Sequence, residues 1–153
     1  MKKFMLILLV LPIWAGCTKS NALRIKDFTH TVCASSTDTR AVEDEGIEST
    51  LTLKYEDGNL RVTCTNSLVN CSFKDYGLAC DVSIEGEAIH YTIDAKTAPN
   101  GSEADCVCLV ETISSLVTGL ETGKEYTFDY AGSPRIHPFT FVFDQGLFLI
   151  QGK

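Results

Sequence analysis

Cysteine offers the most chemistry in this chain, and two of the seven cysteines, Cys106 and Cys108, lie two positions apart. Two thiols close in sequence can form a thiol–disulfide couple that exchanges electrons with a substrate. Such couples usually have the spacing Cys-x-x-Cys at the start of a helix, whose dipole lowers the thiol pKa. Cys106 and Cys108 instead lie in a β-branched and apolar run that predicts a strand. Structural disulfides are therefore favoured, and a periplasmic thiol–disulfide protein is the alternative.

Strand geometry also predicts that Cys106 and Cys108 bond to other cysteines rather than to each other. Side chains two apart in a strand point to the same face. A disulfide needs Cα atoms about 5.5 Å apart and converging Cβ directions. Each of the two thiols is thus expected to have a different partner.

Residues 1–16 have the three parts of a secretory signal, with Lys2 and Lys3 first, an apolar run from Phe4 to Ile13 next, and small residues before Cys17. The apolar run is about ten residues, shorter than the ~20 that a helix needs to span a bilayer. We expect residues 1–16 to be a signal peptide, 17–24 a tether and 25–153 one domain that folds in an oxidising compartment.

The end of the signal, Ala15-Gly16-Cys17, resembles the lipobox of bacterial lipoproteins. The resemblance implies cleavage before Cys17 and acyl chains on its sulfur and amino group, which would anchor the protein in a membrane. The alternative is an ordinary signal peptide followed by a spare cysteine. Surface-exported Bacteroidetes lipoproteins usually carry acidic residues directly after this cysteine, and residues 18–21 have none. The expected location is therefore the bacterial outer membrane, facing the periplasm.

The remaining cysteines are even in number, which in a secreted chain predicts up to three disulfides. They are Cys33, Cys64, Cys71, Cys80, Cys106 and Cys108. Their pairing stays open at this point, because six cysteines allow many connectivities. A structural metal site is disfavoured, since the sequence has no Cys-x-x-Cys pair.

The sequence has no nucleophile elbow, phosphate-binding glycine loop or zinc-binding helix, and none of its three histidines stands beside an obvious nucleophile. Arg135 and His137 lie in the loop Ala131–Pro138 and are candidate ligand contacts, with an ordinary exposed loop as the alternative. We therefore expect no cofactor and no enzymatic activity.

Acidity narrows the choice of partners. The formal net charge is −7, and removal of residues 1–16 would also remove two lysines and no acidic residue. Because nucleic acids are bound mainly through Lys and Arg, a nucleic-acid partner is not expected. The acidity is explained by solubility.

From residue 49 onward, apolar and polar residues alternate as they do in half-buried strands. Three hairpins are predicted, each made of two alternating runs around a turn. The runs are Leu51–Tyr55 with Leu60–Cys64, Ala79–Ile84 with Ile89–Asp94, and Phe139–Phe143 with Leu147–Ile150. Further strands are expected within Ile25–Cys33, Cys106–Leu116 and Glu125–Tyr130, with residues 34–46 as a loop and no convincing helix. About eight or nine strands predict an all-β, antiparallel, disulfide-stapled β-sandwich.

The spacing Leu120-x-x-Gly123-x-x-Tyr126 resembles the tyrosine corner of fibronectin type III and other immunoglobulin-like sandwiches. The resemblance implies an immunoglobulin-like sandwich in which the Tyr126 hydroxyl hydrogen-bonds the backbone a few residues upstream. The alternative is an ordinary half-buried strand tyrosine.

Residues 50–130 also resemble a group of small, mostly uncharacterised lipoproteins of gut Bacteroidetes. The shared motifs are Asn70-Cys71, the Glu-Gly turn, the acidic-flanked Cys-x-Cys and the Gly-Leu-x-x-Gly-x-x-Tyr run. The resemblance implies that Cys71 bonds either Cys106 or Cys108, and it brings no catalytic residue. The expected function is a lipid-anchored envelope module that binds a protein or glycan partner through the loops Ser67–Tyr76 and Ala131–Pro138.

Overall fold

The computed structural model describes residues 22–38, 48–101, 104–133 and 135–152. These residues form ten strands and one short helix. The first part of the chain contains β1 (Arg24–His30), β2 (Cys33–Asp38), β3 (Thr50–Glu56), β4 (Asn59–Asn70) and α1 (Phe73–Tyr76). The second part contains β5 (Leu78–Glu85), β6 (Ala88–Ala95), β7 (Cys106–Thr118), β8 (Lys124–Tyr130), β9 (Phe139–Phe143) and β10 (Phe148–Gly152).

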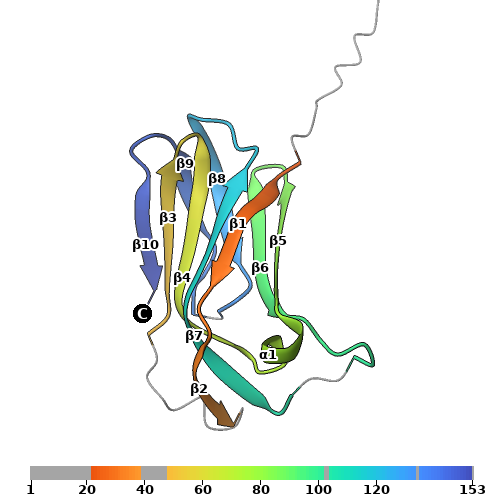
Figure 1. The fold of residues 1–153 in the computed structure, drawn as a ribbon. Helices are drawn as coiled ribbons and strands as arrows, with labels where there is room; N and C mark the ends of the chain where they lie inside the picture. Colours follow the sequence, from red (N-terminus) through yellow and green to blue (C-terminus); the bar gives the residue numbers. More distant parts are fainter. Residues whose placement is uncertain (1–21, 39–47, 102–103, 134, 153) are drawn as a thin grey trace, which may run out of the picture.

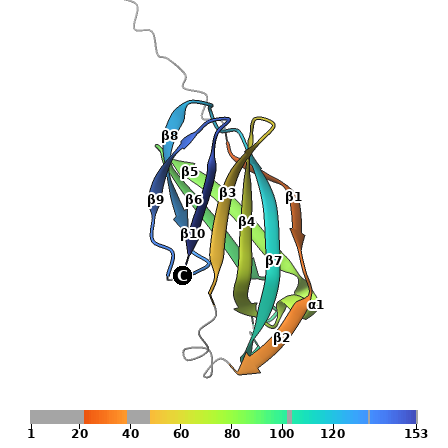
Figure 2. The same ribbon diagram turned by 90° about the vertical axis from the view of Figure 1, so that its left-hand side faces the viewer.

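The strands form a sandwich of two sheets (Figures 1 and 2). One sheet has the order β1-β7-β4-β3-β10, and β2 pairs with the part of β7 that β1 leaves free. The other sheet has the order β5-β6-β8-β9. Its central pair, β6 and β8, is parallel, and the other strand pairs are antiparallel. The prediction of an all-β sandwich is confirmed.

Two of the predicted hairpins, β3–β4 and β5–β6, are present with the expected registers. Asp57 and Gly58 both have positive φ angles, 49° and 80°, which is the conformation that a two-residue hairpin turn requires. Leu51 therefore lies opposite Cys64, and Leu53 lies opposite Val62. Alternation places all four side chains in the core.

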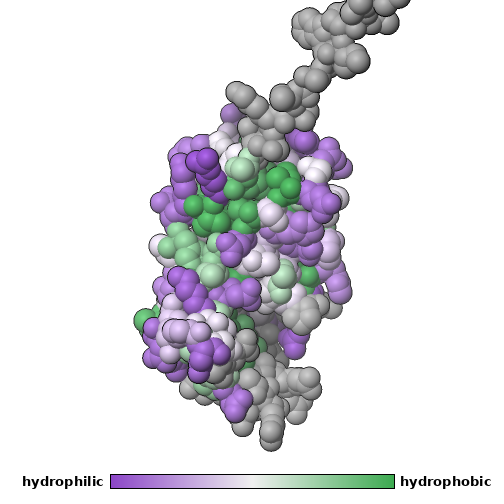
Figure 3. All heavy atoms as spheres, turned by 90° about the vertical axis from the view of Figure 1, so that its right-hand side faces the viewer, coloured by the Kyte–Doolittle hydropathy of each residue, from purple (hydrophilic) through white to green (hydrophobic). Residues whose placement is uncertain are grey.

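The core lies between the inner faces of the two sheets. Its fully buried side chains include Leu51, Leu53, Leu60, Val62, Val110, Ile113 and Val117 from one sheet, and Ile89, Tyr91, Phe128 and Phe143 from the other. Outward-facing positions are more polar, as on the edge strand β5, where Asp81, Ser83 and Glu85 are exposed. Figure 3 shows a small apolar area on the side of the molecule nearest β5, bordered by hydrophilic residues.

The third predicted hairpin is wrong. The turn forms, since the Gly146 N–H donates to Asp144 Oδ1 (2.8 Å), but the chain changes sheets there. β9 pairs with β8, whereas β10 pairs with β3 in the other sheet. Either sheet can accept a strand with one apolar face, so local alternation does not select the partner. Phe148 and Ile150 are 65% and 57% exposed, so the outer face of β10 is not covered by the described residues.

Three smaller predictions are wrong as well. Residues 33–38 form the strand β2 rather than a loop, because the long strand β7 offers an edge beyond the end of β1. With β2, the described residues form ten strands rather than eight or nine. The connection after β4 contains α1, a helix of one turn that the sequence pattern did not indicate.

The two ends of the sandwich carry different features. Arg24, at the start of β1, pairs with Thr118, the last residue of β7. The first residues of β7 lie at the opposite end, next to Asn70 and α1 (Figure 1). A 13-residue strand is about 40 Å long, so this is the distance between the two ends.

Candidate functional site

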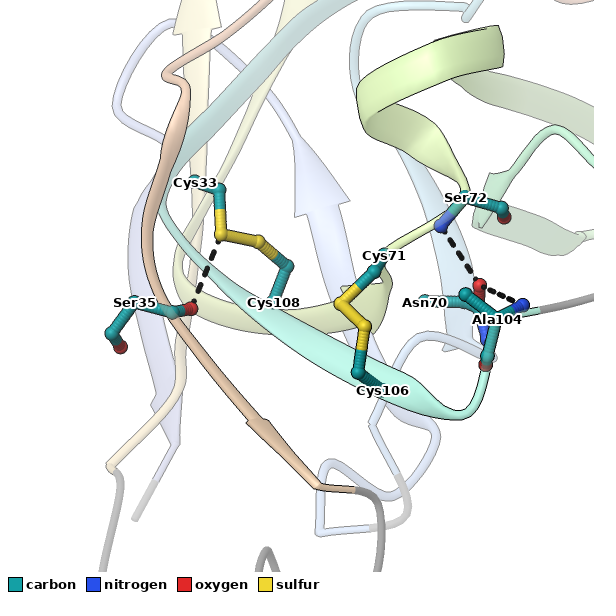
Figure 4. Close-up of a disulfide and its surroundings, with 8 residues drawn as sticks. All are labelled: Cys33, Ser35, Asn70, Cys71, Ser72, Ala104, Cys106 and Cys108. Atoms are coloured by element: carbon teal, nitrogen blue, oxygen red, sulfur yellow. Dashed lines mark hydrogen bonds between the residues drawn. A yellow bond between two sulfur atoms is a disulfide. The ribbon is translucent and has the colours of Figure 1, made fainter.

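Two disulfides join the start of β7 to its neighbours (Figure 4). Cys108 bonds Cys33 of β2, and Cys106 bonds Cys71, with Cα separations of 5.6 and 5.5 Å. Cys106 and Cys108 thus have different partners, as strand geometry predicts. Cys108 is fully buried, so a second thiol cannot reach its sulfur directly, whereas its partner Cys33 is half-buried.

The third expected bridge is absent, and Cys64 and Cys80 are free thiols. The two bridges that form join neighbouring segments at one end of the same sheet. Cys64 lies on β4 and Cys80 on β5, in opposite sheets. Disulfides between the two sheets do occur in immunoglobulin-like sandwiches, so sheet membership alone does not exclude this bridge. The structure leaves both thiols unbonded.

Both free thiols instead belong to a polar cluster inside the core. The Tyr130 hydroxyl lies close enough to the Cys64 thiol to affect its pKa, and the hydroxyls of Tyr91 and Ser115 affect the pKa of Cys80 in the same way. The hydroxyls of Tyr91 and Ser115 lie 2.7 Å apart. Burial raises the pKa of Cys64 to about 12 and also raises the pKa values of Cys80, Tyr91 and Tyr130. Because the thiolate is the reactive form, both thiols are held in their unreactive state.

Asn70 fixes the chain next to the Cys71–Cys106 bridge. Its side-chain oxygen accepts hydrogen bonds from the N–H groups of Ser72 (2.9 Å) and Ala104 (3.3 Å). Its Nδ2 donates to the carbonyl oxygen of Ala104 at 2.7 Å. The amide and the disulfide together join the end of β4 to the segment before β7 (Figure 4). The backbone of Ser72 is therefore held firmly.

The Ser72 side chain has no such partner. It is 6% exposed, and its hydroxyl makes no hydrogen bond within the described part of the chain. In Figure 4 it points away from the Cys71–Cys106 bridge. A buried hydroxyl without a partner costs about 1–3 kcal/mol, so such a group calls for an explanation.

Ser72 lines a hollow at the end of the sandwich remote from Arg24. The hollow has a volume of about 420 Å³, within the usual range of ligand sites. Its lining residues come from the end of β4, the end of β6 and the segments that follow β4, β6 and β8. They are Leu68, Val69, Asn70, Ser72, Ile93, Asp94, Ala95, Thr97, Ala131 and Gly132. Ser72 also lines a second hollow of about 420 Å³ on the side of α1.

Both loops proposed from the sequence contribute to this hollow, but not all of the proposed residues do. Leu68–Asn70 and Ser72 come from Ser67–Tyr76, and Ala131 and Gly132 come from Ala131–Pro138. Arg135 and His137 are exposed and are not part of the lining. Sequence reasoning missed Ser72, because a serine after a cysteine in a predicted loop carries no signal of burial.

Tyr126 makes the contact expected of a tyrosine corner. Its hydroxyl accepts a hydrogen bond from the N–H of Glu121, at 2.9 Å. The side chain is 3% exposed and packs near Phe141, with ring centroids 6.1 Å apart. The contact fixes the turn that carries the chain from β7 into β8. Tyr126 is therefore a structural residue.

Other site types find no support within the described ranges. No group of three or more His, Cys, Asp or Glu side chains is placed to hold a metal ion there. None of the helices in those ranges is long and apolar enough to cross a membrane. Cys17 and the expected signal peptide lie outside the described residues.

Comparisons with protein-family models, curated proteins and solved structures find no match to this chain.

Proposed function

We propose that this protein is a non-enzymatic binding module of the bacterial cell envelope, anchored by acyl chains on Cys17, that holds a protein or glycan ligand in the hollow lined by Ser72. The observation that supports it is a hollow of ligand size whose lining includes Ser72, a buried residue whose hydroxyl has no partner in the described structure. A buried polar group without a partner in a native structure calls for an explanation, and a bound molecule is one.

The arrangement of the two ends supports this proposal. Arg24 lies at one end of β7 and the hollow lies at the other. An acylated Cys17, a few residues before Arg24, would hold the first end near the outer membrane. The hollow would then face the periplasm. We further propose an immunoglobulin-like relationship for the sandwich, which the Tyr126 contact supports.

Anchoring is tested by labelling cells with a radioactive fatty acid. We expect the wild-type protein to take up label and to fractionate with outer membranes. Cys17→Ser should take up none and should appear in the soluble fraction. Label retained by Cys17→Ser would contradict the anchor.

Binding is tested by measuring stability and ligand affinity in the same variant. Ser72→Ala removes a buried hydroxyl that has no partner, so the free energy of unfolding should stay the same or rise. If that hydroxyl contacts ligand, affinity should fall. The probes are short synthetic peptides and neutral disaccharides, added to isotope-labelled protein in detergent and followed by NMR shifts of backbone amides. A stability loss above about 1 kcal/mol would indicate a structural role for Ser72.

A blocking variant supplies the matched control. Ala131→Trp places a large ring at the exposed rim of the hollow, whereas Ala22→Trp places the same ring on an exposed site at the opposite end. We expect Ala131→Trp to abolish the shifts and Ala22→Trp to leave them intact. If no probe shifts amides of the hollow, the proposed function fails.

A further inference from the structure

The hollow is bounded by the edges of two strands rather than by their faces. Three consecutive residues of β4, Leu68–Asn70, and three of β6, Ile93–Ala95, belong to its lining. Successive side chains of a strand point to opposite faces. Three residues in a row can therefore line one hollow only along the strand edge, where the backbone N–H and C=O groups lie.

These edges are also the unpaired ones within the described residues. β3 pairs with β4 as far as Thr65, and beyond that point β4 pairs only with β7 on its other side. β8 pairs with β6 as far as Tyr91, and beyond that point β6 pairs only with β5. Neither β5 nor β7 contributes a lining residue. Among the described residues, the hollow thus lies where one strand of each sheet has no neighbour on one side.

An unpaired strand edge is a template for another extended chain, which forms main-chain hydrogen bonds with it and places alternate side chains in pockets. Here Val69 and Ile93 are buried and apolar and can receive one such side chain. Ala95, Ala131 and Gly132 are small, so a backbone can approach closely. A stretch of three residues offers about 10 Å of edge, which suits three or four residues of a peptide.

Charge narrows the composition of that peptide. Asp94 is the charged residue of the lining, and the chain as a whole has a net charge of −7. An acidic peptide would be repelled, whereas a neutral or basic one would not. Ser72 lies at the same site, beyond the end of β4, and its buried hydroxyl would have to rotate toward the hollow to donate to a peptide carbonyl oxygen.

We propose that the hollow binds an extended, neutral to basic peptide segment of a partner protein, which adds to the edge of β4 in the space beyond the end of β3. The proposal rests on the proposed function, because it names the ligand class of the same site. It differs from a sugar site in requiring the main-chain groups of the ligand.

The test uses three blocked six-residue peptides and the detergent-solubilised protein. The first alternates valine and threonine between terminal lysines, the second has terminal glutamates, and the third has proline in the centre. We expect the lysine peptide to shift the amides of Val69, Asn70, Asp94 and Ala95. The proline peptide should bind about tenfold more weakly, because it lacks a main-chain donor and resists pairing. The glutamate peptide should also bind more weakly.

Asp94→Asn tests the charge argument, with Asp81→Asn as the control on the exposed face of β5. An exposed ion pair contributes up to about 1 kcal/mol, so Asp94→Asn should weaken the lysine peptide about twofold to fivefold and the control should not. Equal binding of the proline peptide would overturn strand addition. Binding of a neutral disaccharide, such as maltose, without any peptide would overturn this inference and leave the proposed function standing. Failure of every probe would overturn both.

Discussion

Tyr91 connects the two sheets through a polar contact in the core. Its hydroxyl lies 2.7 Å from Ser115 Oγ, and both side chains are at most 1% exposed. Tyr91→Phe keeps the ring and removes the hydrogen bond, so we expect a loss of about 1 kcal/mol in the free energy of unfolding. Urea unfolding measures it, with Tyr76→Phe, at an exposed tyrosine, as the control. An unchanged midpoint would show that the Cys80 thiol replaces the lost partner.

Cys64 should make the protein sensitive to alkali. Burial raises the pKa of the thiol from 9.0 to about 12 in the folded state. Below pH 9 the thiol is protonated in both states and adds no pH dependence. Above pH 9 the unfolded chain loses the proton first, so stability falls as pH rises toward 12, by at most about 1.4 kcal/mol per pH unit. The free energy of unfolding should fall less between about pH 8 and pH 10.5 in Cys64→Ala than in the wild type. An equal fall in both proteins would show that Cys64 does not cause the sensitivity to alkali.

At the residue scale, the sequence predicts well which face of a strand a side chain occupies. It predicts poorly which other residue that side chain contacts. Cys64 alternates with Val62 and Leu60, so its inward direction follows from the strand pattern. That it carries a free thiol, whereas Cys71 and Cys106 form a bridge, depends on how distant segments come together, and no local pattern contains that information. The burial of Ser72 depends in the same way on a hydrogen bond from its own N–H to Asn70.

At the scale of elements, β7 pairs with more strands than any other described strand, namely β1, β2 and β4. Its first residues carry both disulfides. The Cys71→Ala/Cys106→Ala double variant opens a loop of 35 residues, and we expect a loss of about 2–5 kcal/mol and a lower Tm.

Differential scanning calorimetry under non-reducing conditions measures that loss. Cys80→Ala, which removes a free thiol, is the matched control and should change Tm far less. The double variant should also weaken peptide binding, because the Cys71–Cys106 bridge fixes the segment of the hollow's lining that contains Ser72. A Tm equal to that of the wild type would show that the Asn70 contacts suffice.

The elements themselves were predictable where local turn chemistry decides the pairing. The Asp57-Gly58 turn specifies the β3–β4 hairpin completely. The Asp144–Gly146 turn is equally well formed, but β9 and β10 separate after it. β10 pairs with β3 although more than ninety residues separate Leu53 from Leu149, and β2 pairs with β7, which is also distant from it in the sequence. Such long-range pairings depend on the whole fold and cannot be predicted from a short stretch of sequence.

For the whole molecule, the thiol count provides a direct check of the arrangement of cysteines. In native protein we expect no rapid reaction of Cys64 or Cys80 with a chromogenic disulfide reagent, since both thiols are largely buried and protonated. In denaturant without reductant, two thiols per chain should react, in addition to Cys17 if it is not acylated. Mass spectrometry of non-reduced peptides should then find Cys33 with Cys108 and Cys71 with Cys106. A Cys64–Cys80 peptide would contradict the structure.

The parallel pair of β6 and β8 has a consequence for the order in which the chain acquires its structure. The strand that lies between them in sequence, β7, belongs to the opposite sheet. When residues up to 95 have emerged, the β5–β6 hairpin exists without β8, and its inner face has no complete opposite sheet until β7 arrives. Pairing over such separations makes folding slow compared with helical domains of this size. The exposed intermediate is the kind of species that chaperones bind, and the Cys33–Cys108 bridge can close only after β7 is present.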